Sequence, residues 1–80
     1  MLNVDNRIDN EIRKADDRYG AFTSTHEGFG VLAEEVTELL YAIRDNDLLA
    51  VERESIQVAA VATRIAYSMH NPSTTQRSQK

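Results

Sequence analysis

The chain contains no cysteine, which excludes disulfide bonds and a zinc site built from cysteine and histidine. With 80 residues, a single small domain buries only about 60–65% of its unfolded surface. We therefore expect oligomerisation to supply part of the missing core. No signal sequence of basic, apolar and small residues opens the chain, so a reducing, cytoplasmic location is expected.

Long apolar runs and clusters of basic residues are also missing. No apolar stretch approaches the roughly 20 residues that a membrane-spanning helix needs. Lys and Arg number 9 against 13 Asp and Glu, which gives a net charge of −4. The missing apolar run argues against a membrane-spanning protein, and the acidic charge argues against a protein that binds nucleic acid by neutralising phosphates. A polyanionic ligand would need metal ions to bridge it to so acidic a chain.

The spacing of the apolar residues predicts three helices. They are expected over Asp5–Tyr19, Thr25–Arg44 and Leu48–Met69. Ser24 and Glu27 match the S/T-x-x-E capping box at the start of the second helix. Residues 1–71 are thus predicted to form one helical domain, and residues 72–80, which include no hydrophobic residue, a disordered polar tail.

Two of these helices carry apolar faces that must be covered. The core-facing residues expected in the second helix are Phe29, Leu32, Val36, Leu39, Leu40 and Ile43. The third helix has two apolar sides, one with Leu49, Ile56, Ala60 and Tyr67 and the other with Val51, Val58, Ala62, Ile65 and Met69. The first helix or another subunit is expected to cover the second side. The predicted fold class is therefore all-α: an antiparallel helical hairpin plus a short N-terminal helix, which completes a four-helix-type bundle by oligomerisation.

Oxygen-bearing side chains recur at (i, i+3) spacing on both long helices. Glu35 and Glu38 share one face of the second helix, and Glu54 and Gln57 share one face of the third. Glu38 and Glu54 stand at similar distances from the turn that joins the helices. Oxygens that converge from two antiparallel helices favour Mg²⁺ or Mn²⁺, which prefer carboxylate, carbonyl and water ligands.

The same acids also fit a purely structural role. Acidic pairs on helices are commonly a solvated, salt-bridged surface. Glu54 interrupts an apolar stripe, where a carboxylate needs a cation or hydrogen-bond partners. That partner is either a metal ion or an arginine: Arg53, Arg64 or one from another helix.

Two segments carry a resemblance to a known family. The sequence EEVTEL at residues 34–39, followed by ESIQVAA at residues 54–60, resembles the MazG-like all-α nucleoside triphosphate pyrophosphohydrolases. Their signature is E-E-x-x-E followed by E-x-x-D on the next helix. HEGFGVLA at residues 26–33 is similar to the segment that precedes the signature in short members, many of them encoded by phages. The resemblance covers about residues 24–70.

The resemblance implies a homodimer or homotetramer that uses Mg²⁺, or Mn²⁺ in its place, to cleave a nucleoside triphosphate to the monophosphate and pyrophosphate. By position it implies that Glu35, Glu38 and Glu54 are the catalytic metal ligands. Gln57 occupies the place of the final Asp of the signature. Its amide oxygen can bind a cation, but a negative charge is lost, and metal affinity follows ligand charge. The site is therefore expected either to work with weaker or fewer ions or to bind nucleotide without turnover.

Phosphate groups need cations besides a metal ion. The candidates are Lys14, Arg18 and Arg53, and His26 is a candidate for contact with a base or for proton transfer. The competing interpretation is an ordinary surface residue, because lone basic residues usually face water and a histidine at a helix start is more often a plain N-terminal residue. The competing function is a non-catalytic helical module for oligomerisation or nucleotide sensing, with a degenerate metal site.

Overall fold

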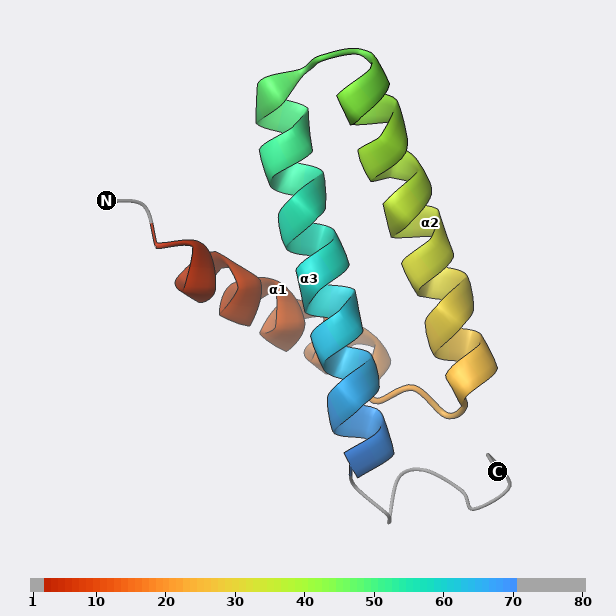
Figure 1. Ribbon diagram of the computed structural model, residues 1–80. Coiled ribbons are helices and arrows are strands. Elements are labelled where there is room, and N and C mark those ends of the chain that lie inside the picture. The colour runs from red at the N-terminus through yellow and green to blue at the C-terminus, as the bar shows by residue number, and fades with distance from the viewer. Residues whose placement is uncertain (1–2, 71–80) are drawn as a thin grey trace.

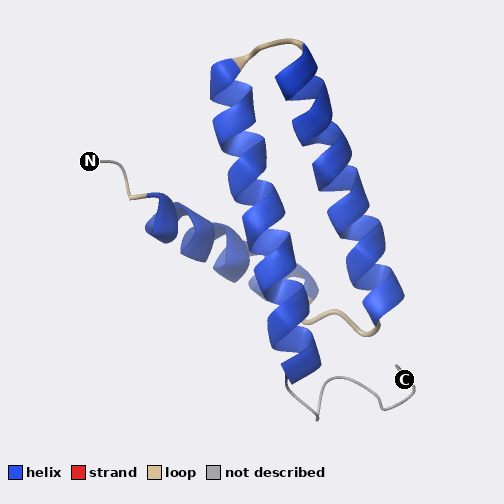
Figure 2. Ribbon diagram, viewed as in Figure 1, coloured by secondary structure: helices blue, strands red, loops and turns tan. Residues whose placement is uncertain are grey.

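The computed structural model describes residues 3–70, which form three helices and no strand (Figures 1 and 2). α1 spans Val4–Tyr19, α2 spans Thr25–Arg44 and α3 spans Leu48–His70. α2 and α3 form an antiparallel hairpin, and α1 crosses α3 obliquely (Figure 1). The all-α prediction is confirmed, and each helix lies within one residue of its expected bounds. The predicted tail over residues 72–80 lies outside the described residues.

The capping side chains explain why the helices begin where they do. Ser24 Oγ accepts a hydrogen bond from the Glu27 backbone N–H at 3.0 Å, as the capping box requires. The Glu27 carboxylate reaches one residue further back than expected and accepts from the Thr23 N–H at 2.8 Å. At the start of α3, Asp47 Oδ1 accepts from the Ala50 N–H at 3.2 Å. The start of α2 predicted from the capping box is therefore correct, and Asp47 caps α3 in a similar way.

α3 is the central helix, because it contacts both α1 and α2. Between residues 3 and 70 the buried apolar residues are few: Phe22, Ala42, Ile56, Ala60 and Val61. The prediction that α3 needs cover on two sides is confirmed, with α1 as the second cover. No helix described between residues 3 and 70 has the length and apolar character to cross a membrane.

A buried arginine fixes the C-terminal end of α1. Arg64 is only 5% exposed, and its guanidinium lies 4.4 Å from the centre of the Phe22 ring. Its Nε donates to Asp16 Oδ1 at 3.0 Å, and its Nη2 donates to the Gly20 carbonyl at 2.8 Å. In the following loop, the Phe22 N–H donates to Ser68 Oγ at 3.0 Å. These contacts hold the α1–α2 connection against the C-terminal half of α3.

The expected core face of α2 is wrong in its details. Phe29 is 65% exposed, Leu40 is 49% exposed and Ile43 is 54% exposed. α3 packs instead on the neighbouring flank of α2, where Gly28 and Ala42 are buried. Their small size is the physical reason, because helices approach most closely where side chains are short.

α3 also departs from its expected faces. Ile56 and Ala60 are buried as predicted, but Leu49 is 77% exposed and Tyr67 is 64% exposed. Both exposed residues lie towards the ends of α3. The apolar side of α3 is therefore covered in its middle and left open at its ends.

The two glycines of α2 provide a matched test of the α2–α3 contact. A Cβ built at Gly28 would lie 2.8 Å from Ile65 Cγ1, whereas one built at Gly30 has no atom outside its own helix neighbourhood within 4 Å. Overpacking costs about 1–3 kcal/mol, and Gly-to-Ala replacement within a helix gains about 1 kcal/mol. We expect Gly30→Ala to raise the free energy of unfolding by about 1 kcal/mol and Gly28→Ala to lower it. Urea unfolding of both variants tests this, and equal stabilisation by the two would contradict the close approach.

Candidate metal centre and adjoining cavities

Three glutamates meet between α2 and α3. Glu35 and Glu38 come from α2 and Glu54 from α3, and one carboxylate oxygen from each lies within 4.8 Å of the others. The hairpin causes this meeting, because residues on either side of the turn at Asp45–Asp47 run antiparallel at similar heights. The predicted convergence of these three residues is confirmed as geometry.

The three acids differ in their exposure to water. Glu38 is exposed, Glu35 is half-buried and the Glu54 side chain is only 15% exposed. Burial raises the pKa of Glu35, and the negative charges of Glu38, Glu54 and then Glu34 raise it further. The charged form of Glu35 is therefore disfavoured both by burial and by the neighbouring negative charges.

Glu54 has a cation partner within the chain. The Nε atom of Arg53 lies 3.5 Å from Glu54 Oε2, and the Arg53 side chain is 61% exposed. Of the arginine partners considered from the sequence, Arg53 is thus the one present. Arg64 is engaged with Asp16 instead. Because the Arg53 side chain is largely exposed to water, which screens its charge, Arg53 balances the charge of Glu54 only weakly.

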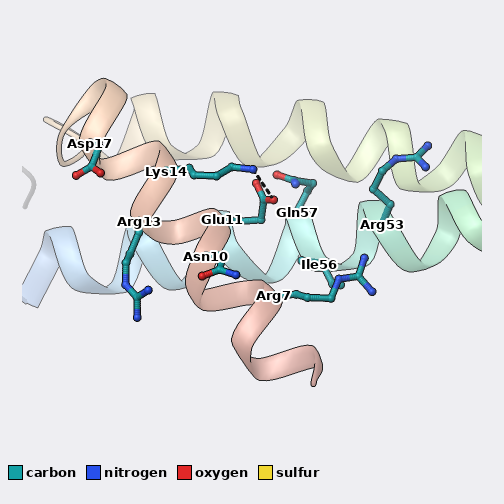
Figure 3. A pocket seen from close by; sticks show the side chains of 9 residues that line it. All are labelled: Arg7, Asn10, Glu11, Arg13, Lys14, Asp17, Arg53, Ile56 and Gln57. Atoms are coloured by element: carbon teal, nitrogen blue, oxygen red, sulfur yellow. Dashed lines mark hydrogen bonds and ion pairs between the residues drawn. The ribbon is translucent and has the colours of Figure 1, made fainter. Parts of the chain in front are cut away.

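Gln57 lies beside Glu11 of α1. The amide side chain of Gln57 is the first cause that lowers the pKa of the Glu11 carboxyl, ahead of the nearby Lys14. Lys14 Nζ lies 3.1 Å from Glu11 Oε2. Figure 3 shows these three side chains gathered between α1 and α3. A carboxylate from α1 therefore lies beside the residue that stands in the place of the signature Asp.

Two cavities between α1 and the hairpin adjoin this arrangement. One, of about 280 Å³, is lined by Lys14, Arg18, Glu35 and Gln57 among others. The other, of about 370 Å³, is lined by Lys14, Gln57 and Arg53 (Figure 3). Lys14 lines both, so α1 forms their shared wall.

The candidate substrate residues therefore separate into two groups. Lys14 and Arg18 line the same cavity as Glu35, and Arg53 lines the second cavity. His26 is exposed in the first turn of α2 and lines neither of these cavities. The structure thus brings Lys14, Arg18 and Arg53 near the acids but does not bring His26 there.

Sequence reasoning missed Glu11 as a neighbour of the site. In the sequence, Glu11 and Lys14 form an ordinary (i, i+3) pair on a polar helix, which indicates only a solvated surface. The approach of α1 to α3 gives the pair its position. The half-buried Ile8 and Ile12 on the same helix were the available signal for the face that α1 turns towards α3.

No family model, curated protein or solved structure matches the chain. The candidate site is therefore defined by the geometry of this chain alone.

The raised pKa of Glu35 predicts how stability depends on pH. A carboxyl whose pKa is raised by folding stabilises the folded state fully below its ordinary value of 4.5, and this contribution is lost as pH rises through the raised value. At neutral pH, without divalent metal, Glu35→Gln should raise the melting temperature, and the gain should disappear below pH 4.5. Thermal circular dichroism in the presence of a chelator measures this.

Glu34→Gln is the matched control for this experiment, because it removes the same charge from the exposed neighbouring position. Its gain in melting temperature should be smaller. Equal gains in melting temperature for the two variants would show that the charge of Glu35 destabilises the fold no more than the charge of Glu34 does.

Proposed function

We propose that this protein is a metal-dependent nucleoside triphosphate pyrophosphohydrolase of the MazG-like type, which produces a nucleoside monophosphate and pyrophosphate. The observation that carries the proposal is the meeting of Glu35, Glu38 and Glu54 within 4.8 Å. These are the acids that the E-E-x-x-E and E-x-x-D resemblance selects from the sequence. A cytoplasmic location belongs to the same proposal.

The donor set fits Mg²⁺ or Mn²⁺. All three groups are hard carboxylate oxygens, the ligands that these ions prefer. Ligands about 2.1 Å from Mg²⁺ stand at most about 4.2 Å apart, so a small movement of the exposed Glu38 would close the cluster around an ion. A divalent ion bound there polarises phosphate oxygens and lowers the pKa of coordinated water.

Other side chains near the cluster are proposed to bind phosphate and to activate the attacking water. Lys14 and Arg18 supply positive charge on the opposite wall of the cavity that Glu35 lines, where they can hold phosphate oxygens. The half-buried Glu35 is the proposed general base, through the carboxylate oxygen that does not face the ion. In the proposed reaction it accepts a proton from the attacking water as the α–β phosphoanhydride linkage breaks and pyrophosphate leaves.

The exposed apolar side of α2 supports the proposal that the chain works as a homodimer or homotetramer. Phe29, Val36, Leu40 and Ile43 are each 45% exposed or more, and Phe29, Val36 and Ile43 recur at seven-residue intervals. Burial of one such side chain contributes about 1.5–3 kcal/mol. Helices from two copies that pack along this stripe would complete a four-helix bundle.

A second candidate is a non-catalytic helical assembly or nucleotide-sensing module. The Arg53–Glu54 ion pair favours it, because it provides a partner for Glu54 without any metal ion. The exposed apolar stripe serves this function equally well. Measurements of catalysis and of metal binding therefore decide between the pyrophosphohydrolase and the non-catalytic module.

The catalytic proposal predicts release of pyrophosphate from at least one member of a panel of ribo- and deoxyribonucleoside triphosphates with Mg²⁺. Glu35→Gln should lower the rate by about 100-fold or more because the general base is removed. Glu34→Gln, at the exposed neighbouring position, should leave the rate unchanged. Absence of pyrophosphate from every nucleotide, at protein concentrations well above trace, would reject the catalytic function and leave the assembly module.

The oligomer predicts that charge on the apolar stripe of α2 separates the subunits. Val36→Glu combined with Leu40→Glu should shift the protein to monomer, because two carboxylates would be buried in the interface. Asn10→Glu, which adds one carboxylate at an exposed position of α1, should leave the assembly intact. Sedimentation velocity measures the change, and a wild-type monomer at high protein concentration would refute the assembly.

A further inference from the structure

The basic residues of this acidic chain gather in one region. The net charge is −4, yet six of the seven lysines and arginines between residues 3 and 70 line one of the two cavities between α1 and the hairpin. They are Arg7, Arg13, Lys14, Arg18, Arg53 and Arg64. Of the 13 Asp and Glu residues, three line either cavity: Glu11, Asp17 and Glu35. The crossing of α1 over α3 therefore separates charges that are mixed along the sequence.

The larger cavity has an excess of positive charge. Its charged lining residues are Arg7, Arg13, Lys14, Arg53, Glu11 and Asp17. Figure 3 shows Arg7 of α1 and Arg53 of α3 on the same side of Ile56. The cavity volume of about 370 Å³ lies within the range of about 300–1,000 Å³ that is typical of ligand pockets. A cleft in which one sign of charge prevails concentrates ions of the opposite sign.

The four cations of this cavity have acidic partners, but these pairs are weak. Arg13 lies 3.9 Å from Asp9, and the side chains of Arg13 and Lys14 are both 71% exposed. The Arg53 side chain is 61% exposed beside Glu54. Ion pairs between exposed side chains contribute little to stability, because water screens their charges. An anion that offers more charge and more oxygen atoms than one carboxylate can therefore displace these partners.

The donor groups of the cavity favour phosphate as the ligand. An arginine guanidinium presents five N–H donors in a planar fork that matches pairs of phosphate oxygens, and a lysine ammonium adds a compact positive charge. Three guanidinium groups and one ammonium group, from two helices that face each other, line the cavity. They suit a ligand with several negative charges spread over more than one tetrahedral group. A chain of linked phosphates has this form.

We propose that the cavity of about 370 Å³ between α1 and α3 binds a phosphate chain through Arg7, Lys14 and Arg53, without a metal ion. The chain is either free pyrophosphate or the phosphate tail of a nucleotide. The three glutamates of the candidate metal centre do not line this cavity, so the inference does not depend on that centre. It replaces the expectation that a polyanion needs metal ions to bind this chain, because only the fold brings the cations together.

Calorimetric titration of pyrophosphate and, separately, of ATP tests this inference at low ionic strength, in buffer cleared of metal ions by a chelating resin. The wild type should bind at least one of them. Arg7→Gln and Lys14→Gln should each weaken binding by about tenfold, because each removes charge-assisted hydrogen bonds to phosphate. Lys14 is paired only within α1, with Glu11, so its replacement leaves the α1–α3 ion pairs intact. Circular dichroism establishes that each variant retains its helices.

Two further variants are matched controls. Glu52→Gln breaks the same α1–α3 ion pair as Arg7→Gln, but it frees Arg7 for the ligand and should maintain or raise the affinity. Arg44→Gln removes a positive charge that lines neither cavity and should leave the affinity unchanged. Weakening by Glu52→Gln would assign the effect of Arg7→Gln to displacement of α1. Weakening by Arg44→Gln as large as that by Arg7→Gln would assign it to net charge, and either result would overturn the inference.

The two ligands distinguish the sources of the phosphate chain. Binding of pyrophosphate would show that the chain alone is recognised, and binding of ATP alone would assign the cavity to the tail of a nucleotide. Binding of neither would overturn the inference. Metal-free binding without pyrophosphate release from any nucleotide would leave this cavity as a phosphate site and reject the proposed hydrolase. Hydrolysis with Mg²⁺ but no metal-free binding would overturn this inference alone.

Discussion

The position of α1 depends on one buried guanidinium. α1 has no buried residue of its own, so apolar packing alone does not hold it. Arg64 donates to Asp16 near the end of α1 and to the Gly20 carbonyl that follows it. Two ion pairs join α1 to α3 near the two ends of α1: Arg7 with Glu52, and Asp16 with Arg64. Because α1 forms one wall of both cavities, the shape of the candidate site follows from these contacts.

The acid cluster opposes the stability of the hairpin that creates it. Three carboxylates within 4.8 Å repel one another, and burial disfavours the charged form of Glu35. A core this small has little stability to spare. Carboxyl groups with pKa values raised by burial and by like charges are typical of functional sites, because an apolar residue at the same position would not repel its neighbours. A divalent ion bound between the three carboxylates would attract each of them and offset their mutual repulsion.

The sequence predicts helix bounds and the pairing of adjacent helices well, but it predicts contacts between segments that are distant along the chain poorly. The bounds of α2 follow from Ser24 and the apolar period, and the convergence of Glu38 with Glu54 follows from an antiparallel turn. The packed flank of α2 was not predictable from hydrophobicity, because Gly28 and Ala42 are less apolar than the stripe beside them. Glu11 and Gln57 are joined only through the crossing of α1 over α3. No periodicity within either helix encodes that crossing.

The short connection between α2 and α3 sets the rotational phase of one helix relative to the other. Residues 45–47 include Asn46 in the left-handed region at φ 55°, and the Asp47 side chain caps the start of α3. One residue inserted within α3 before Glu54 would turn Glu54 by about 100° around the helix axis, which would carry it away from Glu35 and Glu38. Substitution within the connection leaves this register unchanged, whereas such an insertion would separate the two halves of the site while preserving both helices.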